Sequence, residues 1–346
     1  MRDCVLVDRS KSQYKGNFHM HTARSWDSDC PYRQALSEYQ SKGYQFCLVS
    51  DHEVYWDSDE CDTENFIALS GVESAFIVPE TEPKWICDKS RFTHMHVNLI
   101  NDWTVGKPGF AHNQVLKRPV CYGLDSWQNY IDYCRSKNQL VIVNHPSWSR
   151  MAYEDLLSLR GITAFEVINS GCYTDGCGTD ERYWDYCLSK GRRLFGLSGD
   201  DTHHYGPKQI VCGTAFTMLQ ADEFSREGLV AAIKAGSFYA STGPVIHDMR
   251  VQNDVLHMEF SPVKNVMIVS RDFTAKGFFN PCGTLESIDW PIKDRLKYFR
   301  VELVDQQGRK AWSQPVFPGP WDGSSIPALA EDPHTPLPPG TENLQP

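Results

Sequence analysis

The stretch Asn17-Phe18-His19-Met20-His21 is typical of a buried β-strand that ends in two histidines. Alternate residues of a strand point to the same side, so the two imidazoles are expected to lie next to each other. Three later stretches share this design, an apolar run that ends in His or Asp: residues 46–52, 140–145 and 194–203. The sequence therefore predicts a fold that brings these four strand ends together.

The composition narrows the class of protein. The chain has 346 residues, of which 41% are hydrophobic, and this suits one large domain with a smaller one. The net charge of −10 argues against a nucleic-acid-binding surface, which needs a basic face, but it leaves room for a small anion pocket that contains divalent cations. We expect no membrane segment, because no stretch approaches about 18 consecutive apolar residues.

The 12 cysteines do not favour a disulfide framework. Residues 1–7 lack the apolar run of about 7–15 residues that a secretory signal peptide contains. Cys47, Cys134 and Cys187 fall within apolar periods, where thiols pack as small hydrophobic groups. We therefore expect a cytoplasmic protein with reduced thiols.

Amphipathic helices are expected between the strands, over residues 31–42, 126–137, 153–159, 180–190 and 225–235. Alternating strands and helices are typical of parallel βαβ units, and strands that are apolar throughout fit a sheet buried on both faces. Functional residues at strand ends fit both a (β/α) barrel and an open doubly wound sheet. Because several strand ends must converge on one centre, the sequence favours the barrel.

The pattern changes after Gly243-Pro244. Strands are expected over residues 245–260, 266–270 and 298–305, with no long helical pattern between them. From residue 319 the chain is rich in proline and has few apolar anchors, which is typical of an extended tail. We therefore predict a barrel over residues 1–243, a small β-rich, sandwich-like domain over 244–318, and a Pro-rich tail over 319–346.

The candidate metal ligands are informative only when they are taken together. Alone, a strand histidine is often a hydrogen-bonded core residue, and an Asp-His pair often belongs to a turn. Five separate apolar segments nevertheless end in His, Asp or Glu, and burying so many ionisable groups is costly without compensation. Divalent ions supply that compensation, and mixed nitrogen and oxygen ligands suit Zn, Mn or Fe. Because the candidates exceed one zinc site, the sequence predicts two or three ions.

The order of these motifs resembles that of the PHP family, the polymerase and histidinol phosphatase group of metal-dependent hydrolases. The matching residues lie within 17–204: His19-Met20-His21-Thr22, Ser50-Asp51-His52, Gly71-Val72-Glu73, His96-Val97, Asn144-His145-Pro146 and Gly199-Asp200-Asp201-Thr202-His203. The segment 238–244 is similar to a branch with a C-terminal β domain, which includes phosphoesterases and enzymes similar to carbaryl hydrolase. The resemblance implies a distorted (β/α)7 TIM-like barrel.

The resemblance also implies three groups of metal ligands. The groups are His19, His21, Glu73 and Asp201 for one ion, Glu73, His96 and His145 for a second, and an acid with His52 and His203 for a third. The family usually has Ser-Asp after the histidine pair, whereas here Ser25-Trp26-Asp27 inserts a residue. Asp27 is therefore the predicted acid, with Asp29 as the alternative. His94 is the alternative to His96, which directly precedes its apolar run.

Further residues near these motifs are candidates for catalysis and substrate binding. The predicted catalytic residues are Asp201, His203 and His204, because an acid or imidazole beside the ions can protonate a leaving group. Candidates for binding an anionic leaving group are Arg24, Tyr205 and Lys208. Glu166 is a candidate for orienting a ligand, Trp148 for a pocket wall, and the loop with Cys172 and Cys177 for a cover. A purely structural role is an equal alternative for these last residues.

Together these residues predict a metal-dependent hydrolase, in which the ions activate water and polarise the scissile bond. A phosphate monoester is the first expectation, because a third ion suits the charge of its dianion, and the partner is then a small anionic molecule. Hydrolysis of a carbamate, ester or amide is the alternative that the same branch implies. A non-catalytic metal- or ligand-binding protein is the second alternative. The sequences of the loops that would set substrate specificity do not indicate a particular substrate.

Overall fold

The computed structural model describes residues 3–76, 95–119, 123–207, 209–271, 273–293 and 296–318. This part of the chain contains six helices: α1 (Tyr32–Ser41), α2 (Leu124–Ser136), α3 (Tyr153–Ser158), α4 (Ser170–Thr174), α5 (Glu181–Ser189) and α6 (Arg226–Ala235). All except α4 were predicted, each to within two residues of its ends. None of these helices is long and apolar enough to cross a membrane. The predicted tail over residues 319–346 lies outside the described residues.

The ends of α6 show how the sequence sets such boundaries. Ser225 Oγ accepts a hydrogen bond from the backbone nitrogen of Gly228 at 3.0 Å and so caps the first turn. Gly236 follows the helix with a φ of 70°, a left-handed conformation that glycine adopts without steric strain. Leu229 and Ile233, one turn apart, are buried and attach the helix to the core.

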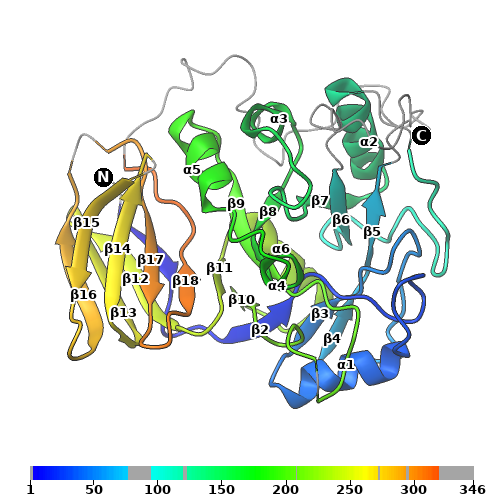
Figure 1. The fold of residues 1–346 in the computed structure, drawn as a ribbon, viewed down its shortest axis with the longest axis horizontal. Helices are drawn as coiled ribbons and strands as arrows, with labels where there is room; N and C mark the ends of the chain where they lie inside the picture. The colour runs from blue at the N-terminus through cyan, green and yellow to red at the C-terminus, as the bar shows by residue number, and fades with distance from the viewer. Residues whose placement is uncertain are drawn as a thin grey trace.

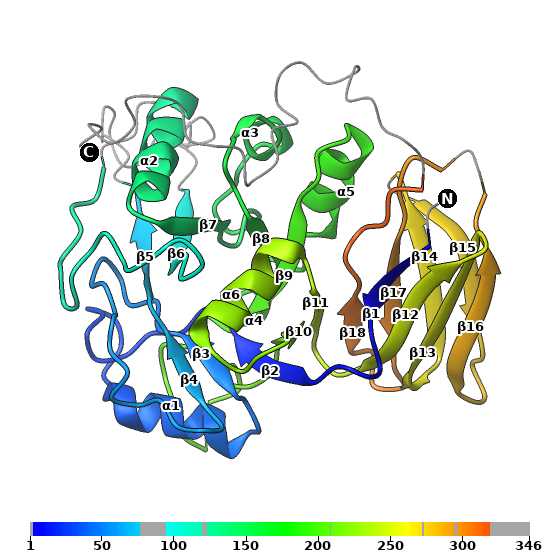
Figure 2. The ribbon, with the colours of Figure 1, turned by 180° about the vertical axis from the view of Figure 1, so that it is seen from behind.

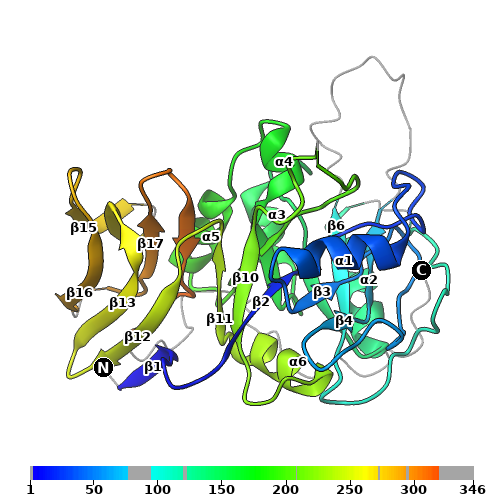
Figure 3. The same cartoon turned by 90° about the horizontal axis from the view of Figure 1, so that it is seen from below.

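The largest sheet crosses the molecule (Figure 3). In spatial order its nine strands are β15 (Phe273–Phe279), β14 (Asn265–Ser270), β17 (Arg300–Val304), β18 (Lys310–Trp312), β11 (Phe238–Ser241), β10 (Phe216–Gln220), β2 (Gln13–Asn17), β3 (Phe46–Leu48) and β4 (Ile67–Leu69). Its described pairs are antiparallel, except those of β2 with β3 and of β3 with β4.

The second sheet has five strands: β5 (Gly71–Ala75), β6 (His96–Asn101), β7 (Gln139–Val143), β8 (Ala164–Asn169) and β9 (Phe195–Gly199). Strand β6 runs antiparallel to both of its neighbours, whereas β8 runs parallel to both of its own. Helices α2, α3 and α5 lie along this part of the molecule (Figure 1).

The third sheet is antiparallel and lies at the opposite end of the molecule (Figure 2). Its strands are β1 (Cys4–Val7), β12 (Ile246–Gln252), β13 (Val255–Val263) and β16 (Leu285–Pro291). A buried apolar cluster joins it to β14 and β17, through residues such as Met249, Leu256, Val266 and Val301. The stretch predicted as strand over 245–260 reverses at Asn253-Asp254, whose φ angles of 52° and 60° suit a two-residue hairpin turn.

The predicted (β/α)7 TIM-like barrel is wrong. Such a barrel needs parallel strands separated by helices, whereas the described residues form 18 strands, six helices and sheets that are mixed or antiparallel. The alternation breaks where strands follow each other without a helix: Ser70 alone separates β4 from β5. A parallel βαβ arrangement is present only locally among the described residues, at β2-α1-β3, β7-α3-β8 and β8-α4-α5-β9.

Two isolated backbone bridges join the nine-stranded sheet to the five-stranded sheet. Met20, beyond the end of β2, pairs in parallel with Thr202, beyond the end of β9. His52, beyond the end of β3, pairs in parallel with Glu73 in β5. The ends of strands from both sheets therefore meet at one place, although no regular barrel brings them there.

Candidate metal centre

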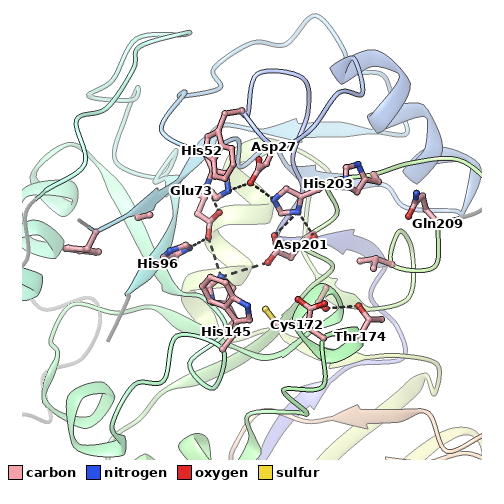
Figure 4. Close-up of a pocket in the computed structure, with 18 of the residues that line it drawn as sticks. Asp27, His52, Glu73, His96, His145, Cys172, Thr174, Asp201, His203 and Gln209 are labelled. Carbon is pink, nitrogen blue, oxygen red and sulfur yellow. Dashed lines mark hydrogen bonds and ion pairs between the residues drawn. The ribbon is translucent and has the colours of Figure 1, made fainter. Parts of the chain in front are cut away.

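The predicted ligands meet beside a cavity of about 700 Å³ (Figure 4). Side-chain donor atoms within 4.8 Å of one another form four groups: His19, His21, Glu73 and Asp201; Glu73, His96 and His145; His21, Asp27, His52 and His203; and His145, Cys172 and Asp201. The first three contain the predicted groups, and Asp27 rather than Asp29 joins the third. These clusters, buried wholly or in part, could hold metal ions.

His96 shows how an antiparallel strand can contribute to this place. It is the first residue of β6, whereas Glu73 lies in the middle of β5, and His19, His21, His52, His145, Asp201 and His203 lie beyond the ends of their strands. Because β6 runs antiparallel to β5 and β7, its beginning lies at the same edge as the ends of those two strands. His96 therefore lies next to His145, with ring centroids 5.1 Å apart.

The surroundings of the His19 imidazole favour a bound cation more clearly than those of the other ligands. Its Nδ1 lies 2.8 Å from Glu166 Oε1, so Nδ1 carries a hydrogen and Nε2 can present a lone pair. That Nε2 faces Glu73 Oε2 at 3.3 Å and Asp201 Oδ1 at 3.2 Å, and it has no hydrogen-bond partner among the described residues. Three acceptors thus point toward one buried position, an arrangement that a cation would relieve.

Ser25 sets the orientation of His21. Its hydroxyl donates to Asp51 Oδ1 at 3.0 Å and accepts from the backbone nitrogen of His52 at 2.9 Å. The same oxygen lies 3.0 Å from His21 Nδ1, and since its one hydrogen is already used, Nδ1 must donate. His21 Nε2 is then left to coordinate, 3.1 Å from Asp201 Oδ1.

Glu73 belongs to two of the groups and uses a different oxygen in each. Oε2 faces the histidine pair, whereas Oε1 lies 3.1 Å from His96 Nδ1 and 3.5 Å from His145 Nε2. Glu73 is also buried, with a side-chain exposure of 1%. A carboxylate in this position can bridge two ions, as the family resemblance implied.

Asp27 connects the third group. Its Oδ2 lies 3.1 Å from His52 Nε2 and 3.3 Å from His203 Nε2. His203 Nδ1 lies 3.1 Å from the backbone oxygen of Asp201, so Nδ1 donates there and Nε2 is the nitrogen that faces the carboxylate. The inserted residue in Ser25-Trp26-Asp27 therefore does not prevent this acid from reaching the centre.

The pKa shifts describe the charge balance of the metal-free centre. Burial would raise the pKa of Asp201, but the neighbouring histidines hold it well below its usual value. Burial would lower the pKa of His52, but Glu73 and Asp27 outweigh it and raise that pKa to about 10. Burial does lower the pKa of His21, to about 4. Protons on some imidazoles therefore balance the carboxylates, and metal ions would compete with those protons.

Glu166 and Asn169 form hydrogen bonds with three candidate ligands: His19, His145 and Asp201. Glu166 Oε1 contacts His19, and Oε2 accepts from the backbone nitrogen of His145 at 2.9 Å and from Asn169 Nδ2 at 2.8 Å. Asn169 Nδ2 also donates to Asp201 Oδ2 at 3.1 Å. Glu166 is completely buried, and these contacts favour an orienting role for it.

Two of the ligands have a strained backbone. The φ angles of His145 and Asp201 are 27° and 56°, in a region that residues other than glycine rarely adopt. Such conformations persist only where surrounding contacts fix them, and they are found preferentially at functional sites.

The predicted substrate-binding residues are placed differently from the ligands. Arg24 Nη2 donates to Tyr55 O at 3.0 Å and to Asn113 Oδ1 at 2.6 Å, and Arg24 does not line the cavity. Tyr205 donates to the backbone oxygen of His21 at 2.7 Å and does not line it either. His204, predicted to be catalytic, is exposed and does line the cavity. The predictions for Lys208 and His94 fall outside the described residues.

Sequence reasoning missed several residues that line the cavity, among them Arg118 and Trp26, and it gave Cys172 no place among the ligands. Cys172, assigned to a loop, lies in α4 with its sulfur within 4.8 Å of ligand atoms from two of the groups. Arg118 reaches the cavity from a segment with no regular structure, and its Nη2 donates to Glu53 Oε2 at 2.8 Å. In the sequence, Trp26 was noted only as the residue inserted between Ser25 and Asp27. No sequence periodicity marks any of the three.

Comparisons with known proteins do not assign the chain to a family. No family model matches it, and no curated protein matches it. Among solved structures it is similar to PsfC from Pseudomonas syringae PB-5123, with a TM-score of 0.41 and 14% sequence identity. The match covers 64% of this chain and 87% of that chain. A similarity at this level identifies neither a family nor a function.

Proposed function

We propose that the protein is a metal-dependent hydrolase that cleaves phosphate monoesters of small molecules. The observation that carries the proposal is the buried His19 Nε2, which faces the carboxylates of Glu73 and Asp201 beside an open cavity. The overlapping ligand groups support two or three ions, and their nitrogen and oxygen donors suit Zn, Mn or Fe. Membership of the PHP family is part of this proposal, because the resemblance rests on the same residues.

Divalent ions held in these groups would lower the pKa of a water molecule and polarise the phosphoryl oxygens. The chain itself must then bind the substrate and supply a proton to the leaving oxygen. His204 suits the second task, because it lines the cavity and belongs to none of the metal-binding groups. Arg118, which also lines the cavity, suits a contact with the phosphate.

The proposal is tested with purified protein loaded with Mn²⁺, Zn²⁺ or Fe²⁺. We expect at least two tightly bound ions per chain by elemental analysis, and metal-dependent turnover of p-nitrophenyl phosphate. Less than one ion per chain would contradict the proposal. p-Nitrophenyl acetate is the parallel substrate: its turnover without turnover of the phosphate would replace phosphoesterase activity by the carboxyl-type alternative.

A further inference from the structure

Two tryptophans in the wall of the cavity are open to solvent, with Trp26 77% and Trp148 42% exposed. Tryptophan is among the residues that are most buried on average. The ring of Trp148 lies against two ligand candidates, with its centroid 4.9 Å from that of His145 and 5.5 Å from that of His96. Trp26 stacks on His52 at 5.9 Å. Each indole is thus held at the edge of the metal centre, with apolar surface left for a ligand.

The cavity is much larger than a phosphate group requires. Its volume of about 700 Å³ falls within the range of roughly 300–1,000 Å³ for pockets that hold drug-sized molecules. Phe76 and Val211 add further apolar side chains to the wall. The space beside the ligand groups therefore suits an organic leaving group with apolar surface.

The charges of the cavity wall limit the charge that the leaving group can have. Of the lining residues that the structure describes, Arg118 alone has a permanent positive charge, and Glu53 already pairs with it at 2.8 Å. Asp175 adds a negative charge to the same wall. Among these described side chains a leaving group with additional phosphates would find little compensation, whereas an uncharged one would not need any.

We infer that the substrate is a phosphate monoester whose leaving group contains an uncharged aromatic ring, and that this ring stacks on Trp148. The inference rests on the proposed function, because it uses the same cavity. In the reaction the bond between phosphorus and the leaving-group oxygen breaks, and a bond between phosphorus and the water oxygen forms. The leaving oxygen receives a proton, so the products are inorganic phosphate and a ring-bearing alcohol or phenol.

Two phosphonates that cannot be hydrolysed test the ring contact independently of turnover. Phenylphosphonate and methylphosphonate are titrated into the metal-loaded full chain by calorimetry. We expect phenylphosphonate to bind at least tenfold more tightly. Trp148→Ala and Trp148→Leu should both remove most of this advantage, Trp148→Phe should retain it, and metal content and methylphosphonate affinity should stay unchanged. Phe279→Ala is the matched control, because this ring is 63% exposed but does not line the cavity.

Equal affinities for the two phosphonates, binding of neither, or an advantage that survives both Trp148→Ala and Trp148→Leu would overturn the inference. A ring preference that depends on Trp148, without turnover of any phosphate monoester, would support the ring contact at Trp148 while removing the proposed activity. Turnover of phosphate monoesters without a ring preference would support the proposed activity and overturn the inference.

Discussion

Arg300 and the candidate metal centre are both buried sites of charge, but their charges are balanced in different ways. Arg300, 1% exposed, donates to Asp185 through Nε at 2.8 Å and Nη2 at 2.6 Å, and to Glu302 through Nη1 at 2.6 Å. Each of these carboxylates therefore has a cationic partner within the chain. In the metal centre, by contrast, the carboxylates of Glu73 and Asp201 face an imidazole nitrogen that has no hydrogen-bond partner among the described residues.

This difference separates a structural cluster from a site that needs a ligand. A buried charge is tolerated when it is paired and hydrogen-bonded, and the Arg300 cluster meets that condition without help. A group of acceptors that face one another meets it only when a proton or a metal ion is bound. Changes at the first cluster should therefore alter stability alone, and changes at the second should alter metal binding and activity.

The largest effect is expected from His19→Ala or Asp201→Ala. Each variant removes a donor from the position where the acceptors converge, so we expect loss of bound metal and at least about a 1,000-fold fall in turnover of p-nitrophenyl phosphate. Elemental analysis and steady-state kinetics measure the two effects, and circular dichroism should show an intact fold. Normal activity in either variant would remove these residues from the site.

Arg300→Met should act on the other cluster. It leaves Asp185 buried without its cation and Glu302 with only Lys310 at 3.7 Å, so the free energy of unfolding should fall by about 3–5 kcal/mol, measured by urea denaturation. The number of ions bound per folded chain should not change. Arg33→Met is the matched control: its pair with Glu60 at 2.7 Å is exposed, and its loss should change stability by less than about 1 kcal/mol.

Acid should weaken metal binding. The pKa of His52 is raised to about 10 in the metal-free centre, so below that pH an ion must displace a proton from this ring. Apparent metal affinity should therefore fall as the pH falls, by at least about tenfold per pH unit and about 100-fold from pH 8 to pH 6. Competition with a chelator at the two pH values measures the change, and equal affinities would show that His52 is not a ligand.

The smallest effect is expected from Glu166→Gln. Both oxygens of Glu166 accept hydrogen bonds from neighbouring donors. In glutamine one of these oxygens is replaced by an amide nitrogen, which is itself a donor, so two donors would face each other and that hydrogen bond would be lost. We expect metal affinity to fall by about 10- to 100-fold with the fold retained. Asp62→Asn, at a carboxylate that pairs with Arg226 at 2.8 Å outside the centre, should leave affinity unchanged. An unaltered affinity in Glu166→Gln would assign Glu166 a structural role.

The sequence predicted helices and ligand positions better than it predicted sheets. A helix such as α6 is determined by local signals, a cap at Ser225 and a stop at Gly236, whereas a strand needs a partner elsewhere in the chain. The apolar pattern of β6 is the same in either direction, so it could not show that this strand runs antiparallel to its neighbours. β1 pairs with β12, and nothing near Cys4–Val7 indicates so distant a partner.

Most of the positions that the structure brings together were predictable because buried His, Asp and Glu at the ends of apolar runs are costly unless a common ligand compensates their charges. His96 and Asp27 were predicted only from the resemblance to the PHP family. Residues that line the cavity from loops had no such signal. Arg118 belongs to no motif and Trp26 only interrupts one, and the position of each depends on how the surrounding segments fold. The role of each loop residue is therefore read from contacts rather than from sequence.

A metal ion bound where the two sheets meet would close a very long loop of chain. His19 and Asp201 are 182 positions apart (201 − 19), so one ion held by both would restrict the unfolded chain as a disulfide does. For loops of about 100 residues, such a restriction stabilises a folded protein by about 4–5 kcal/mol. Because Asp201 and His203 follow all the other ligands in sequence, the site cannot be completed until the last strand of the five-stranded sheet, β9, has been synthesised. The ion would then act as a reversible cross-link, added late in folding.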